Sequence, residues 1–338
     1  MAKIKRLFND PYDIVEEMVE GYVGAHKQYV KMCDLDEAQG RVVLANDAGT
    51  KDKVGVIIGG GSGHEPLFIG YVGEDFADAV VIGNINTSPS PDPCYAAAKA
   101  CDNGKGCIYL YGNYAGDVMN FDMGAEKADE EDDIRVETVL VTDDVVSSEN
   151  IPDRRGIAGD FFVFKVAGAK AATGADLDEV VAAAQKANDN TRSMGVAMSS
   201  ATLPAKGGTI FDMEDGDMEI GMGIHGEPGI RRGKIDTADN VIDEIMEPNL
   251  KDLPYVEGDE VYVLVNSLGA TPLIDLHVCY RRVAQILEEK GIKVYKALVG
   301  PFACSMDMAG MSVTLMKLDD ELKELMDAPC DTPYFTQK

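Results

Sequence analysis

The first half of the chain alternates short apolar runs with segments of helical spacing. A helix start is predicted at Asp10 and Pro11, because an acid before a proline suits a first turn, and apolar residues then recur at helical spacing from Ile14 to Tyr22. Buried strands are predicted at residues 54–58, 79–82, 107–111 and 136–141, with helices near 91–101 and 116–130. This order predicts a largely parallel sheet flanked by helices.

The second half has a less regular pattern. A long helical stretch in two pieces, 156–171 and 176–191, is broken at the turn of Thr173 and Gly174, and we take this break as a domain edge. Beyond it, strands are predicted at 195–199, 218–224, 261–265, 293–298 and 312–317, around helices near 237–246 and 272–290. We therefore predict two α/β domains, residues 1–190 with the parallel sheet and a smaller domain of residues 191–338. The pattern leaves the sheet direction of the second domain open.

Charge and composition exclude several classes of function. The 338 residues include 59 acidic and 31 basic side chains, and the resulting net charge of -28 repels nucleic acid and anionic membrane surfaces. The N-terminus has no apolar signal segment, and no run of about 18 apolar residues occurs. Seven cysteines without a C-x-x-C pair are typical of free thiols in a reducing compartment. We expect a cytoplasmic protein that binds neither nucleic acid nor a membrane.

The densest candidate for chemistry is a glycine loop that follows a predicted buried strand. Residues 54–66 read VGVIIGGGSGHEP, and glycines without a Cβ let the backbone N–H groups of Gly61, Ser62 and Gly63 approach a ligand closely. His64 ends the loop. The third glycine of a dinucleotide-binding fingerprint is missing, and no GK[ST] of a P-loop occurs in the chain. We therefore predict that this chain binds no ATP of its own.

Two further segments carry candidate catalytic side chains. Asp117, in residues 113–121, follows the strand at 107–111, and loops at the carboxyl ends of parallel strands gather ligands; alternatively, Asp117 caps a helix. His225 lies among glycines in residues 221–229. One alternative is that His225 is structural, as a lone histidine often is. Another is that two histidines and a carboxylate bind a metal ion, although no i,i+4 histidine pair occurs. The favoured chemistry is addition of a neutral imidazole to a carbonyl.

Five motifs resemble the K subunit of dihydroxyacetone kinase over almost the whole chain. They are GGGSGHEP (59–66), NYAGDVMNF (113–121), GIHGEPG (223–229), NSLGATP (266–272) and SMDMAG (305–310). The resemblance implies a two-domain α/β fold and a hemiaminal between His225 and the carbonyl carbon of dihydroxyacetone or a related short ketose. It also implies that His64 bonds to the sugar and assists proton transfer, and that Asp117 is the base toward the hydroxyl to be phosphorylated. The backbone of residues 61–63 would cradle the sugar.

The same resemblance implies partners but no cofactor on this chain. ATP-dependent members carry a nucleotide domain after this region, whereas this chain ends at Lys338 and is similar to the stand-alone form. In that form an L subunit holds ADP with Mg²⁺, and an M subunit re-phosphorylates the ADP from the phosphoenolpyruvate phosphotransferase chain. A homodimer is also implied.

One departure from the family leaves the sugar open. Gly112 stands where the family often has a lysine that contacts substrate, so the pocket could suit a longer ketose such as a tetrulose, or the chain could be a paralogue without turnover. The alternative function is therefore a non-catalytic ketose-binding co-regulator of a transcription factor.

Overall fold

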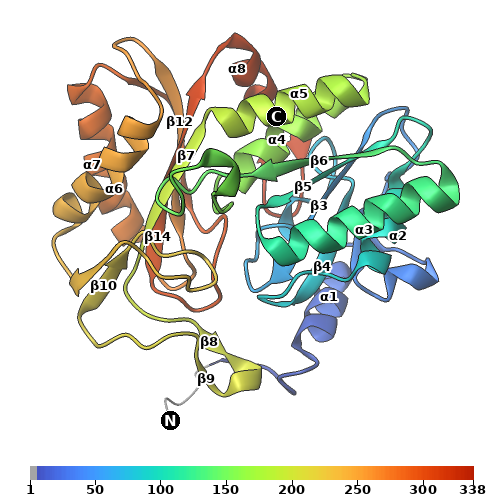
Figure 1. The fold of residues 1–338 in the computed structure, drawn as a ribbon, viewed down its shortest axis with the longest axis horizontal. Helices are drawn as coiled ribbons and strands as arrows, with labels where there is room; N and C mark the ends of the chain where they lie inside the picture. Colours follow the sequence, from blue (N-terminus) through green and yellow to red (C-terminus); the bar gives the residue numbers. More distant parts are fainter. Residues whose placement is uncertain (1–5) are drawn as a thin grey trace. The chain divides into compact units, whose positions relative to one another are not determined.

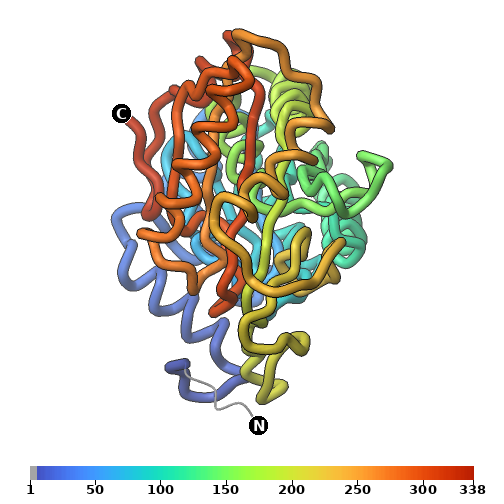
Figure 2. Tube along the Cα trace, turned by 90° about the vertical axis from the view of Figure 1, so that its left-hand side faces the viewer, coloured from blue at the N-terminus to red at the C-terminus, as the bar shows by residue number. Residues whose placement is uncertain are grey.

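The computed structural model describes residues 6–338 and divides into two compact units, each built from several stretches of the chain (Figure 1). The parallel-sheet unit comprises Leu7–Val141, Phe162–Ala187 and Leu322–Lys338. The mixed-sheet unit comprises Arg6, Thr142–Phe161 and Asn188–Glu321. Figure 2 follows the same path along the Cα trace. Each unit contains a six-stranded sheet, and the predicted α/β fold class is confirmed.

The sheet of the parallel-sheet unit has the order β1-β2-β4-β3-β5-β6. The run from β4 to β6 is parallel, whereas β1 and β2 are antiparallel additions at one edge. The bounds are β1 Val30–Met32, β2 Val42–Ala45, β3 Gly55–Ser62, β4 Ala79–Ile85, β5 Cys107–Gly112 and β6 Val136–Val141. Both β3 and β5 are buried along their whole length, as expected for central parallel strands with both faces covered.

The helices that lie wholly or mostly in this unit include a closely packed pair. They are α1 Ile14–Ala25, α2 Pro91–Cys101, α3 Ala115–Asp132, α4 Asp160–Ala172, α5 Leu177–Asp189 and α8 Asp320–Asp327. Helices α2 and α3 lie side by side (Figure 1). A Cβ at Gly124 of α3 would lie 2.5 Å from the Cβ of Cys94, so only glycine permits this helix separation.

The sheet of the mixed-sheet unit has the order β11-β10-β7-β14-β12-β13. Only β12 and β13 pair in parallel; every other neighbouring pair is antiparallel, which settles the direction that the sequence left open. The bounds are β7 Thr191–Ala197, β10 Asp217–Ile220, β11 Arg231–Lys234, β12 Glu260–Ser267, β13 Lys293–Gly300 and β14 Gly310–Leu318. Helices α6 (Ala238–Asp252) and α7 (Leu273–Glu289) pack on this sheet and close an aliphatic core.

Short elements complete the two units. They are the strand pairs β8 Thr202–Leu203 with β9 Gly208–Thr209 and β15 Cys330–Asp331 with β16 Thr336–Gln337, and the 3-10 turns Asp36–Ala38, Ile69–Tyr71, Ile151–Asp153 and Pro204–Lys206. Among residues 6–338, no helix combines the length and the apolar character that crossing a membrane requires.

The predicted helices are present, and two begin later than the sequence indicates. The first helix begins at Ile14, because Asp10 does not cap the helix but accepts the Asp13 N–H in a turn that precedes it. The helix predicted from residue 156 begins at Asp160. The buried carboxylate of Asp143 accepts two backbone N–H groups, at 2.8 Å each, from the segment just ahead of this helix, and so holds that segment out of helical geometry.

The predicted strands are also present, with one displaced and one shortened. The strand predicted at 195–199 occupies Thr191–Ala197, because its first half buries polar side chains that the pattern does not reveal. One of them, Ser193, pairs with the hydroxyl of Thr314 at 2.6 Å. The strand predicted at 218–224 ends at Ile220, and its remainder is a loop. The sequence does not predict β1, β2, β11 or α8, which are short or polar.

The chain passes between the units more than once. It leaves the parallel-sheet unit after Val141, re-enters it at Phe162, leaves again after Ala187 and returns at Leu322. The single boundary predicted at residues 190 and 191 lies near one of these passages only. The final return has a clear cause, since Asp331 bridges to Glu74 and its backbone thereby joins the parallel-sheet unit.

A cluster of buried charge fixes the end of α6 in the mixed-sheet unit. Arg154, which is 4% exposed, donates to both carboxylate oxygens of Asp252 at 2.6 and 2.8 Å. Arg192, also buried, pairs with the same carboxylate. The hydrogen bond from Arg154 is the main cause that lowers the pKa of Asp252, and Arg192 adds to it. One carboxylate thus pairs with two buried cations.

We expect Asp252→Ala to lower the free energy of unfolding by about 3 kcal/mol or more, because it leaves two buried guanidinium groups without their carboxylate. Asp243→Ala is the matched control on the same helix, since Asp243 pairs with Arg282 at the surface. Its expected cost is below about 1 kcal/mol. Urea unfolding followed by circular dichroism measures both, and equal losses in the two variants would contradict the role given to Asp252.

Candidate functional site

The glycine loop and Asp117 lie at the same edge of the parallel sheet. Strands β3 and β5 are parallel neighbours, and His64 follows the carboxyl end of β3 as Asp117 follows that of β5. The turn at Ser88 follows β4, which is the parallel neighbour on the other side of β3. The topology therefore brings these three segments to one edge, where parallel α/β sheets hold ligands.

The glycines of the loop lie against groups that leave no room for a Cβ. A Cβ at Gly59 would lie 2.6 Å from the carbonyl oxygen of Val81, and a Cβ at Gly61 would lie 2.8 Å from the backbone nitrogen of Thr87. Ser62 donates its hydroxyl to the carbonyl of Gly83 at 2.8 Å. These contacts join the loop to β4 and to the segment that follows β4. Tight packing therefore accounts for the glycines before any ligand is considered.

His64 is held inside the parallel-sheet unit. Its side chain is 1% exposed, and its ring meets the ring of Phe68 edge-on, with centroids 6.5 Å apart. The neighbouring Gly63 N–H donates to the carboxylate of Glu65 at 3.0 and 3.1 Å. A ligand that used this N–H would have to displace Glu65.

Asp117 lies in the first turn of α3 but does not cap it. The N-cap residue is Tyr114, so the alternative that Asp117 is the helix cap is wrong. A carboxylate in the first turn is nevertheless stabilised by the backbone N–H groups and the dipole of the helix. The residue is 9% exposed, and its charge, second to burial, raises the pKa of the nearby Cys94 thiol. Asn120, one turn on, donates to the Pro89 carbonyl at 2.7 Å and so fixes this turn against the Ser88 segment.

His225 lies in a ten-residue loop, 221–230, that joins β10 to β11 in the mixed-sheet unit. Its backbone N–H donates to Oε2 of Glu227 at 3.0 Å, and its Nδ1 lies 3.3 Å from Oε1 of the same carboxylate. The histidine side chain is 23% exposed and that of Glu227 is 30% exposed. The ring is therefore held on one side by a carboxylate and remains open to solvent in part.

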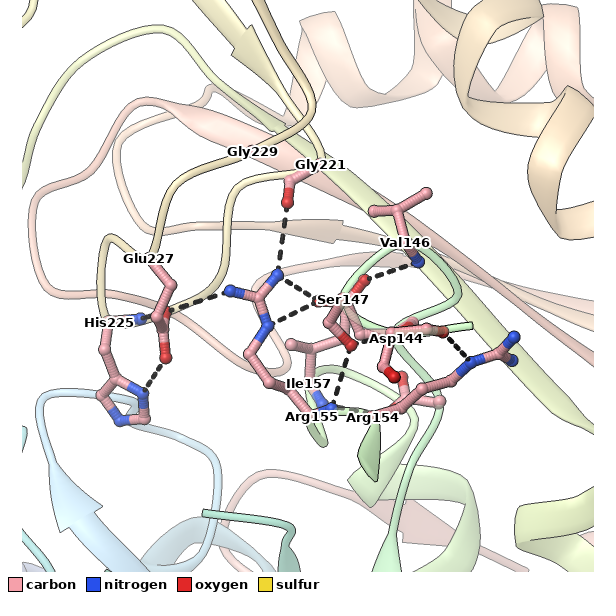
Figure 3. A network of polar contacts seen from close by, with 12 residues as sticks. Asp144, Val146, Ser147, Arg154, Arg155, Ile157, Gly221, His225, Glu227 and Gly229 are labelled. Carbon is pink, nitrogen blue, oxygen red and sulfur yellow. Dashed lines mark hydrogen bonds and ion pairs between the residues drawn. The ribbon is translucent and has the colours of Figure 1, made fainter. Parts of the chain in front are cut away.

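An arginine supports this carboxylate from behind (Figure 3). Nη1 of Arg155 lies 3.9 Å from Oε2 of Glu227, and Nε and Nη2 donate to Oδ2 of Asp144 at 3.0 and 2.7 Å. Burial opposes ionisation of Glu227, but the hydrogen bond and charge of His225, with Arg155 as a further cation, lower its pKa to about 2. Burial, offset only in part by Arg155, raises the pKa of Asp144 to about 6.

Glu227, Arg155 and Asp144 are functional candidates that the sequence reasoning missed. The signal for Glu227 was the carboxylate two residues after His225 in the GIHGEPG motif. No local signal marks Arg155 or Asp144, because they come from a distant segment. Among residues 6–338, no group of three histidine, cysteine or acidic side chains is arranged to hold a metal ion. The seven cysteines are free thiols.

Comparisons with known proteins agree on one family. The family model described as the Dak1 domain matches residues 20–334. The dihydroxyacetone-binding subunit DhaK of PTS-dependent dihydroxyacetone kinase 2 from Listeria innocua is 60% identical over 98% of this chain and 99% of its own length. The L-erythrulose 1-kinase of Mycolicibacterium smegmatis is 43% identical over 97% of this chain, which spans 57% of that larger protein.

Solved structures give the same fold. The dihydroxyacetone kinase of C. freundii, in native form and in complex with AMP-PNP and Mg²⁺, matches with TM-scores of 0.88 and 0.87 at 31% identity. The match covers 98% of this chain and 60% and 61% of those chains. A co-activator of a dihydroxyacetone kinase operon matches with a TM-score of 0.85 at 27% identity, over 95% of this chain and 98% of its own.

The Glu227 contacts predict a pH-dependent contribution to stability. Because the pKa of Glu227 lies near 2 in the folded protein and at an ordinary value of 4.5 when unfolded, its stabilising effect is complete above pH 4.5 and is lost as the pH falls toward 2. Between about pH 5.5 and about pH 4, the advantage of the unmodified protein over Glu227→Gln should shrink by about 1 kcal/mol. Urea unfolding at both pH values measures this difference. An advantage that grows on acidification would contradict an ionised, stabilising Glu227.

Proposed function

The chain belongs to the Dak1 domain family, and from this premise we propose that it is the ketose-binding subunit of a PTS-dependent dihydroxyacetone kinase. The observation that carries the proposal is the similarity to the Listeria innocua subunit, which extends over the whole length of both proteins. The role of such a subunit is to bind and position the sugar while another protein supplies the phosphoryl group.

His225 is the residue that binds the ketone in this proposal. A nitrogen lone pair of the neutral ring forms a bond to the carbonyl carbon, the π electrons of the C=O bond move to oxygen, and the oxygen takes a proton, which gives a hemiaminal. A polyol such as glycerol has no carbonyl and cannot react in this way. The partial exposure of the ring and its carboxylate partner support this role.

His64 and Asp117 act on the oxygen atoms of the sugar. His64 hydrogen-bonds the substrate and gives the proton that the former carbonyl oxygen needs. Asp117 is the base that accepts the proton of the hydroxyl to be phosphorylated. Both side chains are buried, which strengthens their electrostatic effect on a bound hydroxyl, and both follow carboxyl ends of adjacent parallel strands. The backbone of residues 61–63 lies at the same edge and contacts the sugar.

The nucleotide belongs to a partner. This chain contains neither a P-loop nor a dinucleotide fingerprint. ADP and Mg²⁺ are therefore expected on an L-type subunit, which an M-type phosphotransferase subunit recharges from phosphoenolpyruvate. A homodimer of the present chain is part of the same proposal.

The sugar is dihydroxyacetone or a ketose one carbon longer. Gly112, the last residue of β5, stands where the family often has a lysine, so the position holds no ammonium group. The similarity to an L-erythrulose kinase supports a four-carbon ketose as the second candidate.

A non-catalytic co-regulator is the second candidate function. It is favoured by one observation, the structural match to a co-activator of a dihydroxyacetone kinase operon along nearly all of both chains. Retention of a carboxylate at Asp117 favours the kinase subunit, because ketose binding alone needs no base toward the hydroxyl. Turnover with the cognate L subunit decides between them.

The first test concerns the covalent bond. Incubation with dihydroxyacetone should add one sugar to each chain, detected by intact-protein mass spectrometry after trapping, and His225→Ala should abolish the adduct because the nucleophile is gone. His277→Ala is the matched control, since His277 is exposed on α7 of the same unit, and it should keep the adduct. An adduct that survives His225→Ala would refute the assignment.

The second test separates binding from turnover. Asp117→Asn should leave the His225 adduct intact, while phosphorylation falls by roughly 10²–10⁴-fold, the usual range for a positioned acid–base group. The assay contains the L subunit charged with ADP, Mg²⁺ and a phosphoryl source. Asp122→Asn, exposed on the same helix, is the control and should remain active. Near-normal turnover in Asp117→Asn would remove Asp117 from the mechanism, and no turnover in the unmodified protein would favour the co-regulator.

A further inference from the structure

The carboxylate of Glu227 contacts His225 at two points. Oε2 accepts the backbone N–H of His225 at 3.0 Å, and Oε1 faces Nδ1 of the ring at 3.3 Å. The first contact fixes where the loop presents the residue, and the second fixes the rotation of the ring about its own bonds. One side chain therefore controls both the position and the orientation of the imidazole.

The same contact selects a tautomer. An ionised carboxylate only accepts hydrogen bonds, so a neutral imidazole that pairs with it through Nδ1 must carry its proton there. The lone pair of the neutral ring then lies on Nε2. Burial raises the pKa of Glu227, but the contacts with His225 and Arg155 outweigh it and keep this pKa low, so the carboxylate is ionised throughout the neutral range.

Arg155 ties Glu227 to a fixed part of the mixed-sheet unit. Its guanidinium donates twice to Asp144, which is 1% exposed, and reaches the carbonyl of Gly221 at the start of the His225 loop at 3.3 Å. The backbone around Asp144 is fixed on β7, because the Val145 N–H donates to the Ser193 carbonyl at 3.1 Å and the Ser193 N–H donates to the Asp143 carbonyl at 2.8 Å. Figure 3 shows Arg155 between Asp144 on one side and Glu227 on the other.

The close approach of the Glu227 carboxylate and the Arg155 guanidinium depends on a glycine at position 223. A Cβ at this position would lie 2.2 Å from Oε2 of Glu227 and 2.6 Å from Nη1 of Arg155. Any larger residue would have to displace the carboxylate or the guanidinium. The glycine two residues before His225 thus makes room for the supporting pair.

We propose that Glu227 is a positioning residue for His225, holding the proton on Nδ1 so that Nε2 is the nucleophile, and that Arg155, anchored on Asp144, positions Glu227. This inference rests on the proposed role of His225. When Nε2 bonds to the carbonyl carbon and the oxygen takes a proton from a protonated His64, which becomes neutral, the His225 ring becomes a cation whose Nδ1–H faces the carboxylate. Glu227 therefore favours the adduct electrostatically without accepting a proton.

Glu227→Gln is the decisive variant. If the glutamine oxygen keeps the bond to the His225 backbone N–H, its NH₂ group faces Nδ1 and donates to it, which moves the ring proton to Nε2 and blocks the nucleophile. Nitrogen NMR of the ¹⁵N-histidine-labelled protein without ketose, at mildly alkaline pH where histidine is ordinarily neutral, reads the tautomer directly. His225→Ala assigns the signal. We expect the Nδ1–H form in the unmodified protein and a shift toward Nε2–H in Glu227→Gln, with adduct formation slowed by up to roughly 10⁴-fold, the size of effect that a wrong tautomer has on a catalytic histidine.

Glu219→Gln is the matched control. Glu219 supports the same loop through other residues, because it accepts the Gly229 N–H at 2.7 Å and pairs with Arg232. This variant should keep the tautomer and the adduct. An unchanged tautomer in Glu227→Gln, or an equal shift in Glu219→Gln, would overturn the inference. Failure of the unmodified protein to form an adduct would instead overturn the proposed function, and the tautomer would still decide the role of Glu227.

Discussion

Pairing of buried arginine charge is the constraint on which the His225 site depends. Two consecutive arginines, Arg154 and Arg155, extend from one segment in different directions (Figure 3). Arg154 pairs with Asp252, and Arg155 pairs with Asp144 and Glu227. A buried cation such as Arg154 without its partner costs several kcal/mol, so this segment cannot move away from α6 and the His225 loop without breaking the pairs with Asp252 and Glu227. Glu227 contacts both Arg155 and His225, so it holds the loop that carries His225 against this segment. The charge pairs of Arg154 and Arg155 therefore fix the position of the partly exposed His225 ring.

Close approach of backbone and side chain explains the glycines of the motifs better than ligand binding alone. The absence of a Cβ at Gly61 lets the segment after β4 pack against the loop, and the absence of a Cβ at Gly223 leaves room for the side chains of Glu227 and Arg155. In both loops a Cβ would meet atoms at less than 3 Å; at Gly61 these atoms belong to the backbone, which cannot retreat, and at Gly223 the Glu227 carboxylate and the Arg155 guanidinium would have to shift. A glycine-rich loop therefore marks a crowded place, and at Gly223 one of the crowding groups, the Glu227 carboxylate, is also the group that holds His225.

The fold by itself does not decide between an enzyme subunit and a regulator. Structures described as a kinase and as an operon co-activator match this chain with similar TM-scores, so the difference must lie in individual side chains. In the proposed mechanism Asp117 is such a side chain, because a base toward a hydroxyl is needed for phosphoryl transfer and not for binding a ketone. Gly112 is another, because it sets the space and charge at the end of β5. These two positions carry more information about function than the architecture does.

The sequence alone determined most of the helices and strands and the three candidate residues of the motifs. Alternating apolar runs predicted the parallel strands, and the motifs singled out His64, Asp117 and His225, since strand burial and loop glycines are local properties of the chain. It could not show that β7 begins at Thr191, because the buried polar start of that strand is satisfied by a distant strand. Nor could it connect Asp144 and Arg155 with Glu227, some seventy residues later, or the return of residue 331 to Glu74. Only the tertiary structure decided these, because pairing of buried charges and backbone groups depends on which segments meet in space, and no local pattern encodes that meeting.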